Sequence, residues 1–564
     1  MELTRRGWLG LASAAGAVAV AGPLGAAKAA AIPARYREAV ERIRAFALAD
    51  LADKGFPAMQ IALAGPDGFA ATLAVGHSDL ERRLPVREDQ LFQIGSISKS
   101  LVAMALFALA DRGKVDLSAI AQALLPDYPL PPEPITVAQL LEHSSGLPNA
   151  GFSAFPSVPD GRLWTGFAPG SRYSYCNLGY ALIGAIVERA SGMSCAAAVE
   201  TLVLRPLGMA SARPAIRVAD RGLYAIGYAR MREDLPWLPG AALAPAPWID
   251  FDNPAGSVAA TAADMACYLS CLARLAQGKG APLFSDTMAD RFRTGTVDAT
   301  GNGPGARYAN GLVHVTVENR QCLRHTGGMR AFSSAFLLDK ETGLGCYASV
   351  NVGGAGGYRP REVTEYALAM LRAAGAGLPL PQERKPAPPP PVENAARYTG
   401  RWLASDGPEL TIAERGGALF VTAKGRERPL RAAGGEGAFV TDHPALPAQR
   451  FAFDAAPTPL LLLGDRLYGR DRAPPRQPPS PRLSLYAGTY YDAAAWEPRI
   501  VVHALGETLL IGTEALSEAP DGSWRFVDSA GASERIWFQH RVAGRPQTLN
   551  LSGVLFRRLH DDAL

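Results

Sequence analysis

The sequence predicts an α+β domain followed by two small antiparallel β-barrel domains. Two proline-dense polar segments, 378–393 and 473–482, have the composition of semi-rigid linkers and divide the 564-residue chain into three pieces. The first piece, 36–377, mixes helical periodicity with short β-rich runs. The other two, 394–472 and 483–564, carry short alternating strands separated by Gly or Asp turns. The chain length, at about 150 residues per domain, predicts three or four domains.

Individual elements of the first piece can be predicted from its hydrophobic pattern. Apolar residues recur at helical spacing in 100–112 and 179–190, which predicts two helices. The runs 59–64 and 332–338 are short, apolar and rich in β-forming residues, which predicts two strands.

The two barrel pieces resemble each other at a constant offset of 88 residues. The segment YTGRW at 398–402 recurs as YAGTY at 486–490, and RLY at 466–468 recurs as VLF at 554–556. The same register at both ends indicates two copies of one β unit, expected to be a small barrel.

Composition and charge exclude several function classes. The formal net charge is +4, from 57 basic and 53 acidic residues, which is too small for a protein that coats nucleic acid. With 48% hydrophobic and 20% charged residues, the chain can build packed cores, and wholesale disorder is excluded. The six cysteines (Cys176, Cys195, Cys267, Cys271, Cys322 and Cys346) have no metal-knuckle spacing, and we expect most to be buried thiols.

The first 29 residues have the features of an export signal. Arg5 and Arg6 precede a weakly apolar run, and the segment 27–29 supplies a small-x-small cleavage site, an order that resembles a twin-arginine signal. The alternative is a transmembrane anchor, which the low hydrophobicity of the run disfavours. We therefore expect a periplasmic or secreted protein that is not inserted in a membrane once the signal is removed.

The segment around Ser96 carries the strongest chemical signal. A serine hydroxyl needs a neighbouring base to become a nucleophile, and Lys99 lies three residues later, on the same face of a helix. Ser98 is adjacent but would point elsewhere. The apolar run into Gly95 places Ser96 at a helix N-terminus, where the dipole favours a developing anion. A lysine that acts as a base must be neutral, which requires a lowered pKa.

Two later segments supply the context that this short motif needs. Tyr175 and Asn177 precede a predicted helix, and a tyrosine beside a lysine can act as a phenolate-like base or as a proton relay. The segment His325-Thr326-Gly327-Gly328 precedes an apolar strand, and the Gly328 N–H together with that of Ser96 could form an oxyanion hole.

In this order, Ser-x-x-Lys, Tyr-x-Asn and (Lys/His)-x-Gly resemble the serine β-lactamase and penicillin-binding-protein superfamily. The tyrosine version, with Phe-x-Ile-Gly-Ser-x-Ser-Lys at 92–99, is similar to the class C β-lactamase branch. The resemblance covers most of 40–375 and implies a β-lactamase/transpeptidase-like fold, an antiparallel sheet flanked by helices. It implies that Ser96 is the acylated nucleophile, Lys99 its base partner and Tyr175 the proton shuttle. It further implies a substrate-binding role for five residues: Asn177, His325, Thr326, Gly327 and Gly328.

One position departs from the class C pattern. Class C β-lactamases usually have lysine where this chain has His325, and a largely neutral histidine holds the carboxylate of a penicillin-like substrate less firmly. Esterases and aminopeptidases of the superfamily often have His-x-Gly.

The domain order is similar to that of bacterial D-aminopeptidases, in which a loop of the last barrel supplies an acidic group for the free amine of the substrate. By this resemblance the corresponding loop lies within 519–533, with Asp521 and Asp528 as the candidates. Asp521-Gly522 also reads as an ordinary hairpin turn, and that interpretation is favoured for Asp521.

The sequence thus predicts an exported serine hydrolase that forms an acyl-enzyme on Ser96 without a metal or organic cofactor. The expected substrate is a small peptide, amide or ester, preferably with a D-configured residue, and nucleic acid is not an expected partner. A carboxylesterase or a weak β-lactamase is the alternative within enzymes, and a penicillin-binding cell-wall sensor is the alternative outside them. Stereochemical preference and a homodimer both stay open.

Overall fold

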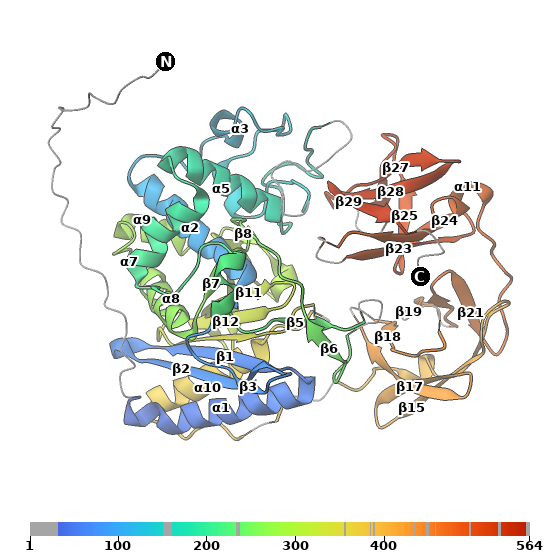
Figure 1. The fold of residues 1–564 in the computed structure, drawn as a ribbon, viewed down its shortest axis with the longest axis horizontal. Coiled ribbons are helices and arrows are strands. Elements are labelled where there is room, and N and C mark those ends of the chain that lie inside the picture. The colour runs from blue at the N-terminus through green and yellow to red at the C-terminus, as the bar shows by residue number, and fades with distance from the viewer. Residues whose placement is uncertain are drawn as a thin grey trace, which may run out of the picture.

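The protein is described from a computed structural model. It covers the following residues: 32–149, 161–232, 237–354, 357–383, 385–386, 390–433, 436–446, 450–456, 458–493, 495, 498–527 and 532–559. Figure 1 shows a first domain of three layers, with helices on both sides of a sheet, and two β-barrels beside it. This is the predicted α+β domain followed by two antiparallel barrels.

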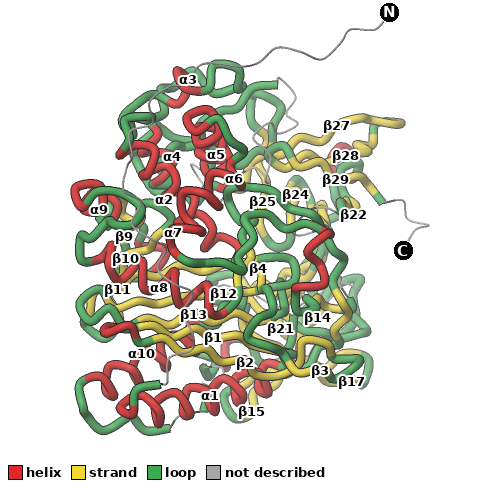
Figure 2. The backbone as a smooth tube through the Cα atoms, turned by 60° about the vertical axis from the view of Figure 1, so that its left-hand side comes forward, coloured by secondary structure: helices red, strands yellow, loops and turns green. Residues whose placement is uncertain are grey.

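The sheet of the first domain is antiparallel and has the strand order β3-β2-β1-β13-β12-β11-β10-β9-β8. Figure 2 shows its central strands one after another. The strand bounds are β1 (Ala58–Ala64), β2 (Ala70–Asp79), β3 (Leu84–Pro85), β8 (Val297–Asp298), β9 (Arg307–Ala309), β10 (Leu312–Val317), β11 (Arg320–Gly328), β12 (Ser333–Asp339) and β13 (Gly345–Val350). Every residue of β1, β12 and β13 is buried, since helices cover both faces, and this explains why apolar residues point to both faces of these strands.

The helices form two layers, one on each face of the sheet. One layer contains α1 (Ala34–Lys54) and α10 (Arg361–Gly375). The other layer is built around α2 (Ser98–Asp111), α5 (Asn177–Ser191) and α8 (Ala262–Ala276). Shorter helices complete the domain: α3 (Ala121–Leu124), α4 (Val137–Leu141), α6 (Cys195–Val199), α7 (Arg205–Leu207) and α9 (Asp286–Phe292). Residues 98–109 of α2 are all buried, so α2 is the central helix of this layer.

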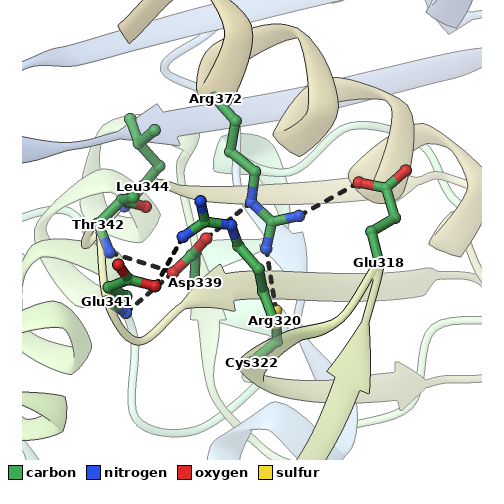
Figure 3. A network of polar contacts seen from close by, with 8 residues as sticks. All are labelled: Glu318, Arg320, Cys322, Asp339, Glu341, Thr342, Leu344 and Arg372. Carbon is green, nitrogen blue, oxygen red and sulfur yellow. Dashed lines mark hydrogen bonds and ion pairs between the residues drawn. The ribbon is translucent and has the colours of Figure 1, made fainter. Parts of the chain in front are cut away.

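Two small sheets and a polar network complete this domain. The small sheets pair β4 (Phe92–Gln93) with β7 (Ala259–Ala260), and β5 (Tyr228–Arg230) with β6 (Leu243–Pro245). Figure 3 shows how Arg372 of α10 reaches the sheet: Nε lies 2.7 Å from the Asp339 carboxylate, and further N–H groups face Cys322 and Glu318. Burial raises the pKa of Asp339, but N–H donors and Arg372 hold it below its usual value, so this buried pair stays charged.

The strands of the first barrel are β14 (Gly400–Leu403), β15 (Leu410–Arg415), β16 (Ala418–Ala423), β17 (Arg426–Ala432), β18 (Ala438–Val440), β19 (Arg450–Phe453), β20 (Leu461–Leu463) and β21 (Arg466–Arg470). Those of the second are β22 (Gly488–Tyr491), β23 (Arg499–Leu505), β24 (Thr508–Ile511), β25 (Glu514–Glu518), β26 (Trp524–Phe526), β27 (Ile536–Val542), β28 (Arg545–Leu551) and β29 (Val554–Arg558). Both barrels are closed. A short helix, α11 (Pro481–Ser484), begins inside the second proline-rich segment.

The two barrels repeat their side-chain contacts at the offset found in the sequence. The Arg470 guanidinium lies 5.4 Å from the Trp402 ring, and that of Arg558 lies 5.6 Å from the Tyr490 ring. Trp402 donates a hydrogen bond to the carbonyl four residues earlier, and Tyr490 does the same. These matching contacts support the interpretation of two copies of one unit.

Among the described residues no single helix is long and apolar enough to cross a membrane. Taken together, the two helical segments Asn177–Ser191 and Cys195–Leu207 have the length and apolar composition of a membrane span, but they are bent by 74° at the break between them. The described residues also contain no group of three or more His, Cys, Asp or Glu side chains that could hold a metal ion. All six cysteines are free and five are buried, as expected, while Cys267 is half-buried.

Candidate active site

Ser96 lies at the start of the central helix of the first domain. It is the middle residue of a short 3-10 turn, Gly95–Ile97, that runs directly into α2. Gly95 has a φ of +57°, and a Cβ atom on it would lie 2.8 Å from the amide nitrogen of Gly328. Only glycine therefore lets this turn approach the end of β11 so closely. The positive end of the helix dipole favours negative charge at this position.

Lys99 is fully buried beneath Ser96. Its Nζ lies 3.1 Å from Ser96 Oγ and 2.8 Å from both Asn177 Oδ1 and the carbonyl oxygen of Ala255. Burial holds the pKa of Lys99 well below its usual value, which favours the neutral amine. In the structure Nζ donates to all three oxygens, those of Ser96, Asn177 and Ala255. In the neutral amine two N–H groups can stay on Asn177 and Ala255, and the lone pair can then accept the proton of the Ser96 hydroxyl, as a base requires.

Tyr175 contacts Ser96 from the other side. Its hydroxyl donates a hydrogen bond of 2.8 Å to Ser96 Oγ. Burial raises the pKa of Tyr175 above its usual value, so the side chain is a neutral phenol. Of the two roles that the sequence left open for Tyr175, this geometry favours the proton relay over the phenolate base.

The end of β11 packs directly on the turn that holds Ser96. A Cβ atom on Gly327 would lie 1.9 Å from the carbonyl oxygen of Ile94 and 2.4 Å from Ser334 Oγ. Gly327 is therefore required for this approach, which brings the backbone of Gly328 next to Gly95. The N–H groups of Ser96 and Gly328 thus lie on adjoining backbone segments, as an oxyanion hole requires.

His325 belongs to a buried chain of hydrogen bonds that connects two parts of the site. The Cys176 N–H donates to His143 Nδ1 over 3.1 Å, so the proton of His143 is on Nε2, which faces the Tyr308 hydroxyl at 3.1 Å. The Tyr308 hydroxyl then donates to His325 Nε2 over 3.2 Å, and His325 Nδ1–H donates to the carbonyl of Thr326 over 2.7 Å. This order of donors fixes both tautomers. Through its bond to Cys176, His143 thus supports the segment that carries Tyr175 and Asn177.

A cavity of about 600 Å³ opens over Ser96. Of the sequence-predicted site residues it is lined by Ser96, Tyr175, Asn177, His325, Thr326 and Gly328; Lys99 and Gly327 lie behind its wall. Three guanidinium groups also line it, those of Arg324, Arg359 and Arg361, and none of the described lining residues is acidic. Burial and the charge of Arg361 lower the pKa of both Arg324 and Arg359. Glu365 offsets part of this charge at Arg324, and the remaining positive charge favours a substrate that carries a carboxylate.

The second barrel reaches the edge of this cavity through the segment before β27. Ser533 Oγ donates a 2.6 Å hydrogen bond to the carbonyl of Gly146, and Trp164 Nε1 donates a 2.6 Å bond to the carbonyl of Ser533. The Glu534 carboxylate accepts a 3.2 Å hydrogen bond from the N–H of Asn149. The Asn149 side chain lines the cavity and accepts two hydrogen bonds from Asn177, which contacts Lys99.

The acidic residue at the cavity edge is therefore not Asp521. The Asp521 carboxylate accepts hydrogen bonds from the N–H and hydroxyl of Ser523 and pairs with Arg525 and Arg535, which is the turn role favoured from the sequence. Asp528 lies outside the described residues. Sequence reasoning missed Glu534, because the expected loop ended one residue before it.

The sequence profile of the Beta-lactamase family matches residues 38–371, which is more than half of the chain. The chain belongs to the beta-lactamase family. The Beta-lactamase match begins inside α1 and ends inside α10, and the cavity, Ser96 and its partners in the first domain lie within it.

Similar proteins of known name include hydrolases of more than one kind. The esterase EstB of Burkholderia gladioli is 37% identical over 168 residues, 24% of this chain and 41% of the esterase. A D-aminopeptidase of Cereibacter sphaeroides is 26% identical over 318 residues, 50% of this chain and 56% of the aminopeptidase. The chain thus spans less than two thirds of each of these relatives.

One solved structure extends the likeness beyond the beta-lactamase domain. The octameric penicillin-binding protein homologue from Pyrococcus abyssi has a TM-score of 0.54 at 22% identity, covering 76% of this chain and 99% of that chain. At this identity the likeness concerns the fold alone.

In this beta-lactamase-family site, the acidic limb of the pH profile is expected to belong to Lys99. We expect the neutral amine to be the active form. Burial lowers its pKa, so kcat/KM should fall as pH falls through that pKa. Tyr175→Phe should lower kcat/KM about 10²- to 10⁴-fold and leave the acidic limb at the same pH. If the fall of kcat/KM at acidic pH disappears in Tyr175→Phe, the base is Tyr175 and not Lys99.

The neutral histidines are expected to make the protein less stable in acid. Burial lowers the pKa of His325 from 6.5 to about 3, and that of His143 well below 6.5, so the unfolded chain binds more protons below pH 6.5. Stability should fall as pH falls from about 6.5 to 5, by up to about 1.4 kcal/mol per pH unit for each histidine. His325→Gln, compared by urea unfolding at several pH values, should flatten this slope; an unchanged slope would contradict the assignment.

Proposed function

We propose that the protein is a serine hydrolase that works through an acyl-enzyme on Ser96. The observation that carries the proposal is that Ser96 Oγ is hydrogen-bonded both to the buried Lys99 behind the cavity wall and to Tyr175 in the cavity. It supplies a nucleophile, a base and a proton relay.

In the proposed reaction, the Ser96 hydroxyl gives its proton to Lys99 Nζ while Oγ attacks the substrate carbonyl carbon. The carbonyl oxygen becomes an oxyanion that the N–H groups of Ser96 and Gly328 stabilise. When the bond to the leaving group breaks, the leaving amine or alcohol receives that proton from Lys99 through Tyr175. Water then attacks the acyl-enzyme, loses a proton to the Tyr175 and Lys99 pair, and Ser96 Oγ leaves as a restored hydroxyl.

We propose as the substrate a short peptide whose first residue is small and D-configured. The likeness to the D-aminopeptidase and the two barrels after the family domain support this class. Glu534, which accepts a hydrogen bond from the N–H of the cavity residue Asn149, is the carboxylate that we assign to the free amine, in place of Asp521 or Asp528. The cluster of Arg324, Arg359 and Arg361 suits a carboxylate on the leaving group of the substrate. The leaving group of a peptide ends in such a carboxylate, and the ammonia that leaves a simple amide has none.

An esterase is the second candidate, and the 37% identity with EstB favours it. A weak β-lactamase is a further candidate. The buried His325 is neutral and adds no charge for a β-lactam carboxylate, whereas the three arginines of the cavity would attract one, so nitrocefin belongs in the substrate panel.

A substrate panel tests the proposal. It compares a D-alanyl dipeptide, D-Ala and L-Ala p-nitroanilides, D-alanine amide, short acyl esters and nitrocefin. We expect the highest kcat/KM for the D-alanyl dipeptide. Hydrolysis of the acyl esters but of no peptide or amide would support the esterase. If a fluorescent penicillin labels Ser96 stably and no substrate is turned over, the protein is a penicillin-binding sensor and the enzyme assignment is wrong.

Glu534→Gln tests the amine site separately, because glutamine keeps an acceptor for the Asn149 N–H. We expect KM to rise about 10-fold for substrates with a free amine, as a charged hydrogen bond is lost. Acyl esters without an amine are the control, and their KM should stay the same. An equal rise for both would show that Glu534 acts on the site as a whole.

We also propose that residues 1–29 direct export through the twin-arginine route; they lie outside the described residues. Replacing Arg5 and Arg6 by lysine should retain the protein in the cytoplasm, as fractionation would measure.

A further inference from the structure

Tyr308 is a fully buried tyrosine beside the active site that belongs to none of the three catalytic motifs. It lies in β9 and borders the catalytic cavity. Its ring contacts that of His143, with the ring centres 4.7 Å apart, and that of His325, at 5.8 Å. The proposed reaction gives Tyr308 no step, so its position between two buried histidines needs another explanation.

The backbone next to Tyr308 is anchored on α2, the helix that carries Lys99. Strands β9 and β10 are joined by Asn310-Gly311, whose φ values of +57° and +76° are those of a tight hairpin turn. A Cβ atom on Gly311 would lie 2.6 Å from the Cα atom of Ser100 and 2.7 Å from the carbonyl carbon of Lys99. Only glycine lets the turn approach the helix so closely. Tyr308 is therefore two residues from a fixed contact with α2.

The hydroxyl of Tyr308 connects the two other catalytic segments. On one side it faces Nε2 of His143, which accepts the N–H of Cys176 in the Tyr-x-Asn segment. On the other side it donates to Nε2 of His325 in β11. Nδ1–H of His325 donates in turn to the carbonyl of Thr326, directly before the two glycines at the proposed oxyanion site. One hydroxyl thus joins the segment of the proton relay to the strand of the oxyanion site.

The hydroxyl of Tyr180 also faces that of Tyr308. It donates its own proton to the carbonyl of Leu141 over 3.0 Å. That proton is therefore not available to either histidine, and the link between His143 and His325 depends on Tyr308.

We infer that Tyr308 is a positioning residue that fixes the three catalytic segments relative to one another. The inference rests on the proposed acyl-enzyme function. Without the hydroxyl, the donor of His143 and the acceptor of His325 would both lack a partner in a buried site, which is unfavourable. The two segments would then shift relative to Ser96, and a displacement of about 1 Å can lower a reaction rate about 10²-fold.

The test is Tyr308→Phe in the full-length protein, with p-nitrophenyl acetate as the substrate. Phenylalanine keeps the ring that borders the cavity and removes only the hydroxyl. We expect kcat to fall about 10- to 100-fold with little change in KM, because the catalytic groups are displaced while the cavity surface is kept. In NMR of nitrogen-labelled histidine, the Nε2 resonances of His143 and His325 should both move. The resonances of His325 are identified by their loss in His325→Gln.

Tyr268→Phe is the matched control. Tyr268 is also fully buried, and its hydroxyl is hydrogen-bonded over 2.7 Å to Ser100 Oγ, so it joins α8 to α2 next to Lys99. Its loss should lower stability to a similar extent, measured by urea unfolding, and leave kcat and both histidine resonances unchanged. An unchanged kcat in Tyr308→Phe, or an equal fall in both variants, would overturn the inference while the proposed function stands.

The wild-type protein decides the case in which Tyr308→Phe does not fold. The inference requires the proton of His325 on Nδ1 and that of His143 on Nε2, and the same NMR experiment reports both. A proton on Nε2 of His325 would overturn it, because the Tyr308 hydroxyl would then not donate to that nitrogen. If p-nitrophenyl acetate does not acetylate Ser96 in the wild type, the proposed function is wrong, and this inference with it.

Discussion

Replacing Ser96 by alanine is expected to lower hydrolysis of every substrate by at least about 10³-fold, because the nucleophile is lost and only general binding effects remain. The change removes one atom from a half-buried position, so the fold should survive. Mass spectrometry should then find no acylated protein, and steady-state kinetics no saturable activity.

Ser98 supplies the matched control for this experiment. Its hydroxyl is buried and accepts a 3.1 Å hydrogen bond from the Val258 N–H, away from Lys99. Ser98→Ala should cost about 1 kcal/mol of stability and leave the activity of the folded enzyme unchanged. If Ser98→Ala were inactive and Ser96→Ala active, the nucleophile would be Ser98 and not Ser96.

Replacing Gly327 by alanine is expected to have the second largest effect. The new methyl group would lie 1.9 Å from the carbonyl oxygen of Ile94, so β11 and the turn with Ser96 must move apart. The Gly328 N–H would then no longer meet the carbonyl oxygen of the substrate. We expect kcat to fall about 10²- to 10³-fold, the usual effect of losing one oxyanion-hole donor, with a smaller change in KM.

Gly222→Ala is the control for the added methyl group. Nothing lies within 4 Å of its Cβ position and its φ is not positive, so neither structure nor rate should change. Equal kcat in Gly327→Ala and wild type would mean that the approach of β11 to Ser96 is not needed for catalysis.

The importance of Ser96 can be predicted from the sequence, whereas that of Gly327 for the position of Ser96 cannot. Ser96 and Lys99 are three residues apart on one helix, so local geometry alone brings them together. Gly327 matters because of Ile94, more than 200 residues earlier, and that contact exists only in the folded sheet.

The strands of the first domain were predicted for a similar local reason. The runs 59–64 and 332–338 fall on β1 and β12, in which apolar residues occur on both faces because both faces are buried. The barrels were predictable from the repeat, and the matching Arg470 and Arg558 contacts follow from the same offset. None of these patterns contains information about how the barrels meet the first domain.

By itself, the sequence determined the family domain, the two barrels, the nucleophile motif and the order of the three catalytic segments. Each depends on spacing within a short stretch or on a direct repeat. Only the tertiary structure decided that Glu534 rather than Asp521 reaches the cavity edge, that Arg359 and Arg361 line it, and that Tyr308 connects His143 with His325. These depend on contacts between segments far apart in the chain, which no local pattern specifies, because packing of whole domains sets which side chains meet.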